Sequence, residues 1–581
     1  MSSPRLRTQF ERLFEHFQGE DCAIQLEELT DILCCTRRNT RIVLNKLAEE
    51  GWIEWVPAAG RGKLSQLIFK RNKVDVSENL AKRYLEEGKI EHALSVLDND
   101  PARLTQVFQG YLGFSHLEGQ QVIRLPYYRQ LATLHPHKPT RRSEQHIIRQ
   151  VFSGLTKLDE QEQVNADLAH HWDMLSPTHW RFYLRSGVRF HNGDRLTTND
   201  IIHSIEQLKS LALFEHIESV SSPSNNTLDI HLSQSDYHLP LLLTETPAKI
   251  MQASCERQSN QRNQSNQSND NYDLIPNGTG PYKVTRNDSA RLVLEAFEHY
   301  FGYRPLIERV EVWVIDEAHS SMVYPSLTHP DTPAEGQFTD VELDPGCTYL
   351  LLNRKTGIAK DNNWASYLAQ KLNPFSLMRG IPDQKVIEIG LLHAHGLKPG
   401  WHHSGILQSQ PKPPSTSPDQ SGGEYKTQIT VAYHGTHPVF PYVIQSIKQL
   451  LKEDGIQLKA IKYDLTVENP DEVDIWVKSM GLANNRKDAL IGWLLGYSDI
   501  DIMSTEDNFR DWKQMVSDWR SQPDHVFPAK ELAKQLVQTH QLIPMFHCWL
   551  GVSQEQCGSL QNASCNALGW FDFSQVWVKP E

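Results

Sequence analysis

The stretch RFHNGDRLTTND, residues 189–200, describes a tight turn followed by the start of a helix. Its Asn-Gly pair is a strong signal for a short turn between two extended segments. Thr197 or Thr198 offers a side-chain oxygen for the N-cap of a helix, and Asp200 supplies an acid for the first helical turn. The stretch therefore predicts a turn that leads into a capped helix, and it contains no residue that has to perform chemistry.

The residues on both sides of this stretch extend the pattern. Trp180, Phe182 and Leu184 alternate with polar residues, which predicts a half-buried strand. After the turn, four apolar residues recur at helical spacing: Ile201, Ile202, Ile205 and Leu208. Further along, IPNGTGPYKV (275–284) places Gly278 and Gly280 before a strand. This G-x-G lacks the third glycine of a dinucleotide-binding loop, so it predicts a turn and close backbone packing.

The first 75 residues predict a different kind of unit. Three helices are expected, over 5–17, 26–34 and 37–50, with Thr36 as the N-cap of the third helix and Gly51 as its end. WIEWVPAAGRGKLSQLIF (52–69) then predicts a β-hairpin whose tip is basic. This order is that of a winged helix-turn-helix, in which the third helix enters the major groove of DNA.

A compact basic region lies inside this predicted unit. The whole chain has a formal net charge of -13, but residues 37–73 contain nine Lys and Arg against three Glu. The side chains that we expect to contact DNA bases or phosphates are Thr36, Arg37, Arg38, Asn39, Arg41, Asn45, Arg61 and Lys63. A solvated basic surface on a small helical domain, or a surface that binds RNA or protein, is the alternative interpretation.

Length and composition limit the remaining possibilities. At 581 residues the chain predicts three or more structural units. No apolar run approaches the ~20 residues of a membrane span, and the N-terminus has no apolar signal segment, so we expect a cytoplasmic protein without a membrane partner. The eight cysteines form no C-x-x-C pair, which favours reduced thiols over disulfides or zinc. Because G-x-S-x-G and H-E-x-x-H motifs are absent, we expect no catalytic residues, no metal and no cofactor.

The long C-terminal part resembles a known family. EQHIIRQVFSGLTKLDE (144–160), ADLAHHW (166–172), WRFYLRSGVRFHNGDRLTTNDI (180–201) and GTGPYKV (278–284) are similar, in order, to segments of extracytoplasmic solute-binding proteins that include oligopeptide binders. The resemblance implies a two-lobed α/β body that binds a small molecule in its cleft. The acidic residue with which oligopeptide binders hold the peptide amino group has no clear match in SMGLANNRKDALIGW (479–493).

A second resemblance covers nearly the whole chain. CTRRNTRIVLNKLAEEGWIEW (35–55), GRGKLSQLIF (60–69), LPYYRQL (125–131) and ALGWFDFSQVW (567–577) are similar to SgrR-type bacterial transcriptional regulators. That resemblance implies a cytoplasmic regulator that senses a small molecule, a sugar phosphate or a related metabolite. It also implies that the regulator activates a small-RNA stress gene and represses its own gene.

These interpretations combine into one expected architecture, a multidomain α+β protein. We expect a winged helix-turn-helix over 1–75, a helical connector over 76–121 and a solute-binding-like body over 122–581. Two polar segments, 252–273 and 409–426, have the composition of disordered insertions. The expected partners are promoter DNA and a small-molecule effector, for which Tyr282, Arg486 and Trp549 are the candidate ligand residues. A core position for the two aromatic residues and an exposed loop position for Arg486 are the alternatives. The alternative is a cytoplasmic solute-binding or scaffold protein whose N-terminal unit binds a protein partner.

Overall fold

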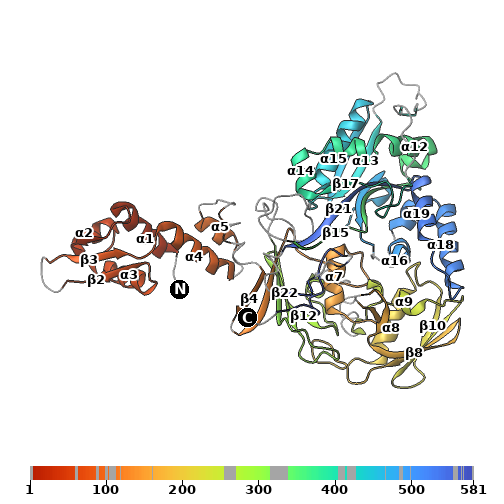
Figure 1. Cartoon of the computed structure of the whole chain (residues 1–581), viewed down its shortest axis with the longest axis horizontal. Helices are drawn as coiled ribbons and strands as arrows, with labels where there is room; N and C mark the ends of the chain where they lie inside the picture. The colour runs from red at the N-terminus through yellow and green to blue at the C-terminus, as the bar shows by residue number, and fades with distance from the viewer. Residues whose placement is uncertain are drawn as a thin grey trace. The chain divides into compact units, whose positions relative to one another are not determined.

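The computed structural model describes most of the chain (Figure 1). The residues that it does not describe are 1–3, 59–62, 87–89, 98–102, 104–106, 108–112, 118, 160, 254–269, 315–337, 404–411, 415–426, 465, 483–488, 497–498, 554–559, 564–565, 567 and 579–581. The chain divides into two compact units, with the boundary between Leu112 and Gly113. None of the described helices is long and apolar enough to cross a membrane.

The N-terminal unit combines helices with a small antiparallel sheet (Figure 1). Its elements are α1 (Pro4–Phe17), β1 (Cys22–Ile24), α2 (Leu26–Ile32), α3 (Arg37–Glu49), β2 (Ile53–Val56), β3 (Ser65–Phe69), α4 (Lys73–Glu86) and α5 (Ile90–Val96). β3 lies between β1 and β2 and pairs antiparallel with both. The three helices and the hairpin match the prediction, whereas the short strand β1 adds a third strand that the sequence pattern did not indicate.

The core of this unit holds α3 in place. Phe10 of α1 is fully buried, and its ring centroid lies 5.6 Å from that of Trp52 and 6.0 Å from that of Phe69. Leu44 and Leu47 of α3 are also fully buried. Because these residues occupy one face of the helix, the opposite face of α3 is turned toward solvent.

The second unit is a two-lobed α/β body with three principal sheets among its described residues. The five-stranded sheet contains β4 (Gly113–Leu117), β5 (Gln120–Tyr127), β12 (Tyr282–Asn287), β13 (Arg291–Ala296) and β14 (Arg309–Val314). The four-stranded sheet contains β8 (Ala169–Ser176), β9 (His179–Leu184), β10 (Ile217–Ser221) and β11 (Thr227–Leu232). The seven-stranded sheet contains β15 (Phe338–Leu343), β16 (Cys347–Leu352), β17 (Leu391–His393), β18 (Gln428–His434), β19 (Gln457–Tyr463), β20 (Ile475–Met480) and β21 (Leu542–Ser553).

Helices and short strand pairs complete the body. The helices are α7 (Arg142–Val151), α8 (Thr198–Leu208), α9 (Leu239–Leu242), α11 (Asp270–Leu274), α12 (Asn362–Lys371), α13 (Pro374–Arg379), α14 (Asp383–Ile389), α15 (Phe440–Glu453), α16 (Ala489–Leu495), α17 (Asp499–Met503), α18 (Glu506–Arg520) and α19 (Ala529–Gln538), with 3-10 turns η1 (Thr246–Ala248), η3 (Ile358–Lys360) and η4 (Pro470–Glu472). The short pairs are β6 (Thr156–Leu158) with β7 (Val164–Ala166), and β22 (Leu560–Gln561) with β23 (Trp577–Val578). Phe571 and Phe573, near the C-terminus, pack into the same core cluster as α7 and the five-stranded sheet.

Residues 180–208 have the expected local structure. Trp180, Phe182 and Leu184 of β9 are buried, and Gly193 has a φ of +91° in the turn. Thr197 forms a capping box with Asp200, in which each side chain bonds the backbone N–H of the other residue. The capped helix α8 then buries its apolar stripe in the same core cluster as β9.

Gly278 and Gly280 permit a close approach of two backbones, as predicted. A Cβ atom on Gly278 would lie 2.0 Å from the carbonyl oxygen of Val151, and one on Gly280 would lie 2.5 Å from the carbonyl carbon of Val151. The N–H of Gly280 donates to that same oxygen at 2.8 Å. The end of α7 is therefore held directly against the strand that begins at Tyr282.

The domain limits differ from those expected in two places. The body includes β4 and β5, which pair with each other in the five-stranded sheet, so its regular structure starts before residue 122. In the expected insertion 252–273, Gln252 and Ala253 are buried and α11 begins at Asp270, so the ends of that segment are packed. The polar composition of the segment does not reveal that its two ends pack against the rest of the body. Most of 409–426 lies outside the described residues.

Candidate functional sites

Helix α3 presents the first candidate site, a polar face that projects from the N-terminal unit. Thr36 is the N-cap, and its side-chain oxygen accepts a hydrogen bond from the N–H of Asn39 at 3.4 Å. Arg38, Arg41 and Asn45 are exposed and lie on one face, since residues three, four and seven positions apart align along a helix. Such a face can approach base edges in the major groove of DNA.

The structure separates the predicted DNA-contacting residues into groups. Arg37 forms an ion pair with Glu27 at 2.9 Å, and the side-chain amide of Asn39 donates to the sulfur of Cys35 at 3.3 Å. Both side chains are thus engaged within the domain. Lys63 is exposed at the hairpin, whereas Arg61 lies outside the described residues. Ile42, which is 45% exposed within the same face, is a candidate that the charge pattern missed and that its isolated apolar character could have indicated.

Replacing Thr36 with alanine should destabilise the first turn of α3 by about 1 kcal/mol, because the N–H of Asn39 loses its side-chain partner. We expect amide hydrogen exchange in that turn to become roughly fivefold faster, measured by mass spectrometry on the full chain. Thr36→Ser keeps the hydroxyl and should exchange at nearly the wild-type rate. Equal acceleration in both variants would show that the cap does not hold the helix start.

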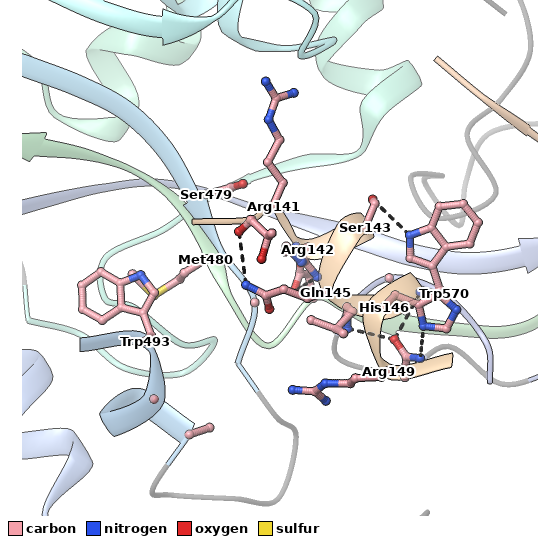
Figure 2. Close-up of a pocket in the computed structure, with 18 of the residues that line it drawn as sticks. Arg141, Arg142, Ser143, Gln145, His146, Arg149, Ser479, Met480, Trp493 and Trp570 are labelled. Atoms are coloured by element: carbon pink, nitrogen blue, oxygen red, sulfur yellow. Dashed lines mark hydrogen bonds and ion pairs between the residues drawn. The ribbon is translucent and has the colours of Figure 1, made fainter. Parts of the chain in front are cut away.

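The second candidate site is a cavity of about 850 Å³ inside the body. Helix α7 carries Arg142, Gln145 and Arg149 along one wall, and Trp493 of α16 and Trp570 stand on either side (Figure 2). The indole of Trp570 donates to the hydroxyl of Ser143 at 3.1 Å. The volume is in the range of pockets that bind small molecules.

Ion pairs neutralise several of the cations that line the cavity. Arg142 donates to the carboxylate of Asp344, with the shorter contact at 2.7 Å. Arg129 forms a two-point pair with Glu144, in which one N–O distance is 2.9 Å. These pairs fix the side chains and leave little of their charge for a ligand.

Arg141, at the N-cap of α7, is held by hydrogen bonds to uncharged groups. Its guanidinium donates to Thr436 at 3.3 Å and also bonds the ring of His434 and the carbonyl oxygen of Asp464. Burial, followed by the charge of Arg129, lowers the pKa of Arg141. Its donors therefore bridge α7 to the end of β18, which belongs to the other lobe of the body.

Three histidines of the cavity wall are uncharged at neutral pH. Burial and the nearby charge of Arg141 lower the pKa of His434 to about 2 and that of His437 to about 3. Burial lowers the pKa of His146 to about 3, and its ring stacks on Trp570 with a centroid distance of 5.5 Å. Such imidazoles can offer hydrogen bonds without adding charge.

Two of the residues predicted to hold the effector, Tyr282 and Trp549, do not line the described cavity. Tyr282 lies in the core: its side chain is fully buried, and its hydroxyl lies 2.9 Å from the carbonyl oxygen of Ile307 and 3.0 Å from that of Phe573, either of which can accept its hydrogen bond. Trp549 follows Cys548 on β21, and successive residues of a strand face opposite sides, so Cys548 lines the cavity and Trp549 does not. Arg486 lies outside the described residues.

Helix α7 supplies the cavity residues that the sequence interpretation missed. Most of its sequence, RSEQHIIRQV, belongs to the segment that resembles solute-binding proteins, and that resemblance names no binding residue there. Ser143, Glu144, His146 and Gln150 of this helix are all buried. Several buried polar residues on one short helix are unusual and point to an internal polar site.

One cluster of possible metal ligands occurs among the described residues, at His179, Asp229 and His231 on the four-stranded sheet. Both carboxylate oxygens of Asp229 already accept hydrogen bonds from Arg181, each at 2.7 Å. Arg181 and His179 thus already pair with Asp229, and the arrangement is explained as a partly buried ion-pair network.

The fold and the two sites define a class of protein, in which a helix-turn-helix unit is joined to a body of the bacterial solute-binding fold. Residues 5–119 match the family described as the sugar transport-related small RNA regulator N-terminal domain, and residues 163–323 match the family 5 extracellular solute-binding proteins. The chain is 36% identical to the HTH-type transcriptional regulator SgrR of Pectobacterium atrosepticum over the full length of both chains. It belongs to the SgrR family of transcriptional regulators.

Solved structures support the fold of the body. OppA of Burkholderia pseudomallei matches 80% of this chain and 100% of its own with a TM-score of 0.61 and 15% identity. The solute-binding protein MoaA of A. tumefaciens R10, solved with mannopinic acid, matches 79% of this chain and 100% of its own with a TM-score of 0.59 and 17% identity. At such identities the likeness establishes the fold alone.

Proposed function

We propose that this regulator is cytoplasmic, binds promoter DNA through α3 and the β2–β3 hairpin, and responds to a small anionic metabolite in the cavity of its body. The observation that carries the proposal is the cavity itself, which a simple DNA-binding protein does not need. An exposed basic helix in one unit and a polar cavity in another unit of the same chain support a sensor that links a ligand to transcription.

The lining of the cavity supports a polyhydroxylated anion such as a sugar phosphate as the effector class. Cationic groups of Arg149 and Lys249 can attract an anionic group, and the carboxylates of Asp167 and Glu245 can accept hydrogen bonds from hydroxyls. Trp493 and Trp570 add flat surfaces of the kind on which sugar rings pack. MoaA, which shares the fold, was solved with mannopinic acid.

The coupling that we propose follows from differential binding. A ligand that contacts both lobes of the body stabilises their closed arrangement in proportion to its preference for that arrangement. If the closed and open forms differ in DNA affinity, ligand binding and DNA binding are linked by the same free energy in both directions. By family membership we propose that the regulated genes are a small-RNA stress gene, which is activated, and the regulator's own gene, which is repressed.

We also propose that the cavity binds its ligand without converting it. Burial raises the pKa of Cys548 to about 12, and burial and Asp344 raise the pKa of Cys347 well above its ordinary value. These thiols are protonated at neutral pH and are weak nucleophiles. The buried imidazoles of His434 and His437 titrate far below neutrality, where a general base works poorly.

The test is a titration of the full-length protein against its own upstream DNA and a scrambled duplex at fixed salt, with and without glucose 6-phosphate. We expect at least 10³-fold preference for the upstream DNA, the lower end of specific recognition, and a shift of that affinity when glucose 6-phosphate is added. Glucose is the uncharged control and should produce no shift. Equal affinity for both duplexes would overturn the DNA-binding proposal and favour a scaffold whose N-terminal unit binds a protein.

A further inference from the structure

Lys249 is the most enclosed cation among the described residues of the cavity wall. It follows η1 directly, lines the cavity and is only 5% exposed. Its backbone forms an antiparallel bridge with Gly154, and a Cβ atom on Gly154 would lie 3.3 Å from the amine nitrogen of Lys249. The missing side chain at residue 154 therefore makes room for the amine.

The amine of Lys249 differs from the other cations of the wall in its contacts. Arg129 and Arg142 are paired with carboxylates, and Arg149 lies 4.0 Å from Glu245. Within the described part of the chain, the amine of Lys249 makes no hydrogen bond and has no carboxylate within 4.0 Å. A buried ammonium without a close partner is costly, so a site of this kind is stabilised by an anion that enters it.

The charged groups around Lys249 come from four neighbouring segments. Arg149 of α7 and Lys157 of β6 add positive charge, whereas Asp167 and Glu245 add negative charge. Burial is the largest influence and lowers the pKa of Lys249 to about 8. The phenol of Tyr300 also lines this part of the cavity and is neutral, because burial raises its pKa.

We propose that Lys249, assisted by Arg149, binds the phosphate or carboxylate group of the effector, and that Asp167 and Glu245 accept hydrogen bonds from its hydroxyls. This assignment rests on the proposed function in one respect, that the cavity is the effector site. An anion beside the amine supplies the directly bonded partner that the amine lacks among the described residues, and the carboxylates fit the hydroxyl-bearing part of the same ligand.

Isothermal titration calorimetry of the full-length protein tests the assignment with glucose 6-phosphate, gluconate and glucose. Lys249→Met keeps most of the length of the side chain and removes the charge, so the affinity for the anion should fall about 10- to 100-fold. Lys283→Met, at a partly exposed lysine paired with Glu295 outside the cavity, is the matched control and should bind like the wild type. Tighter binding of glucose 6-phosphate than of gluconate identifies phosphate as the anionic group, and the reverse identifies carboxylate. An unchanged anion affinity in Lys249→Met would overturn the assignment.

The pH dependence of the effector affinity gives a second test of the role of Lys249. Only the protonated amine attracts the anion, so affinity is highest below the pKa of about 8 and falls as the pH rises through that value. Glucose 6-phosphate stays a dianion across this range, since its second pKa is about 6. Roughly a tenth of the amine remains protonated one pH unit above its pKa, so affinity should be about tenfold lower at pH 9 than at pH 7. A flat profile in the wild type would contradict the role of Lys249.

Labelling of the wild-type protein separates the failure of this inference from the failure of the proposed function. An amine-reactive acetylating reagent at pH 8, read by mass spectrometry, should modify Lys249 more slowly when inorganic phosphate is present. Lys283 should react at the same rate with or without phosphate. If neither sugar anion binds but phosphate protects Lys249, the anion site stands and the proposed effector class is wrong. Absence of protection would overturn the anion site itself.

Discussion

Replacement of Arg38 with alanine is expected to weaken binding to the regulator's own upstream DNA about 10- to 100-fold, equivalent to roughly 1–3 kcal/mol. Arg38 lies in the first turn of α3, is exposed, and has no ion-pair partner among the described residues. A guanidinium in that position can bond two acceptors on one guanine edge. The loss should be much smaller on a scrambled duplex, since random sequences do not present the same base at that place.

Two further variants test whether the loss of specific DNA binding is a property of Arg38 and not of any basic residue in this unit. Arg37→Ala removes a side chain that is already paired with Glu27, so its effect on specific binding should be smaller than that of Arg38→Ala. Lys63→Ala removes an exposed hairpin charge that we expect to contact phosphate, so it should weaken binding similarly on both duplexes and reduce the salt dependence. Titrations at several salt concentrations measure all three. An equal loss for Arg38→Ala on specific and scrambled DNA would show that this residue does not read bases.

Replacement of Gly280 with alanine should destabilise the body by about 2–3 kcal/mol, the upper part of the range of about 1–3 kcal/mol for overpacking substitutions. The added Cβ atom would lie 2.5 Å from the carbonyl carbon of Val151 and 2.6 Å from the carbonyl oxygen of Gln150, both of which are backbone atoms. The end of α7 would have to move, and Arg149 and Gln150 of the cavity wall would move with it. Effector affinity should therefore fall along with stability.

Urea denaturation and calorimetric titration measure these two effects. Gly193→Ala is the matched control, because a Cβ atom there meets nothing within 4 Å and the only cost is its left-handed backbone, with a φ of +91°. That variant should lose about 1 kcal/mol and keep its effector affinity. If Gly280→Ala were no less stable than Gly193→Ala, the close approach of the two backbones would not be a constraint on the fold.

Features that depend on neighbouring residues in the chain could be predicted well. Thr36 and Thr197 cap helices because a hydroxyl at the N-cap reaches a backbone N–H only three residues away. The exposed face of α3 follows in the same way from the helical period, which places Leu44 and Leu47 in the core opposite Arg38 and Arg41. The ion pair between Arg37 and Glu27 could not be predicted in this way, because Glu27 belongs to another helix.

Local sequence patterns predict the types of unit in this protein: a basic winged helix-turn-helix and a large α/β body with capped helices and close-packed glycines. The composition of the cavity follows from the three-dimensional packing instead, because Arg149, Lys249 and Trp570 are far apart in the chain. Tyr282 shows what a local pattern cannot decide, because an aromatic residue at the start of a strand has the same local signature in a core as in a binding site. Burial and long-range contacts, which no local pattern encodes, distinguish the two.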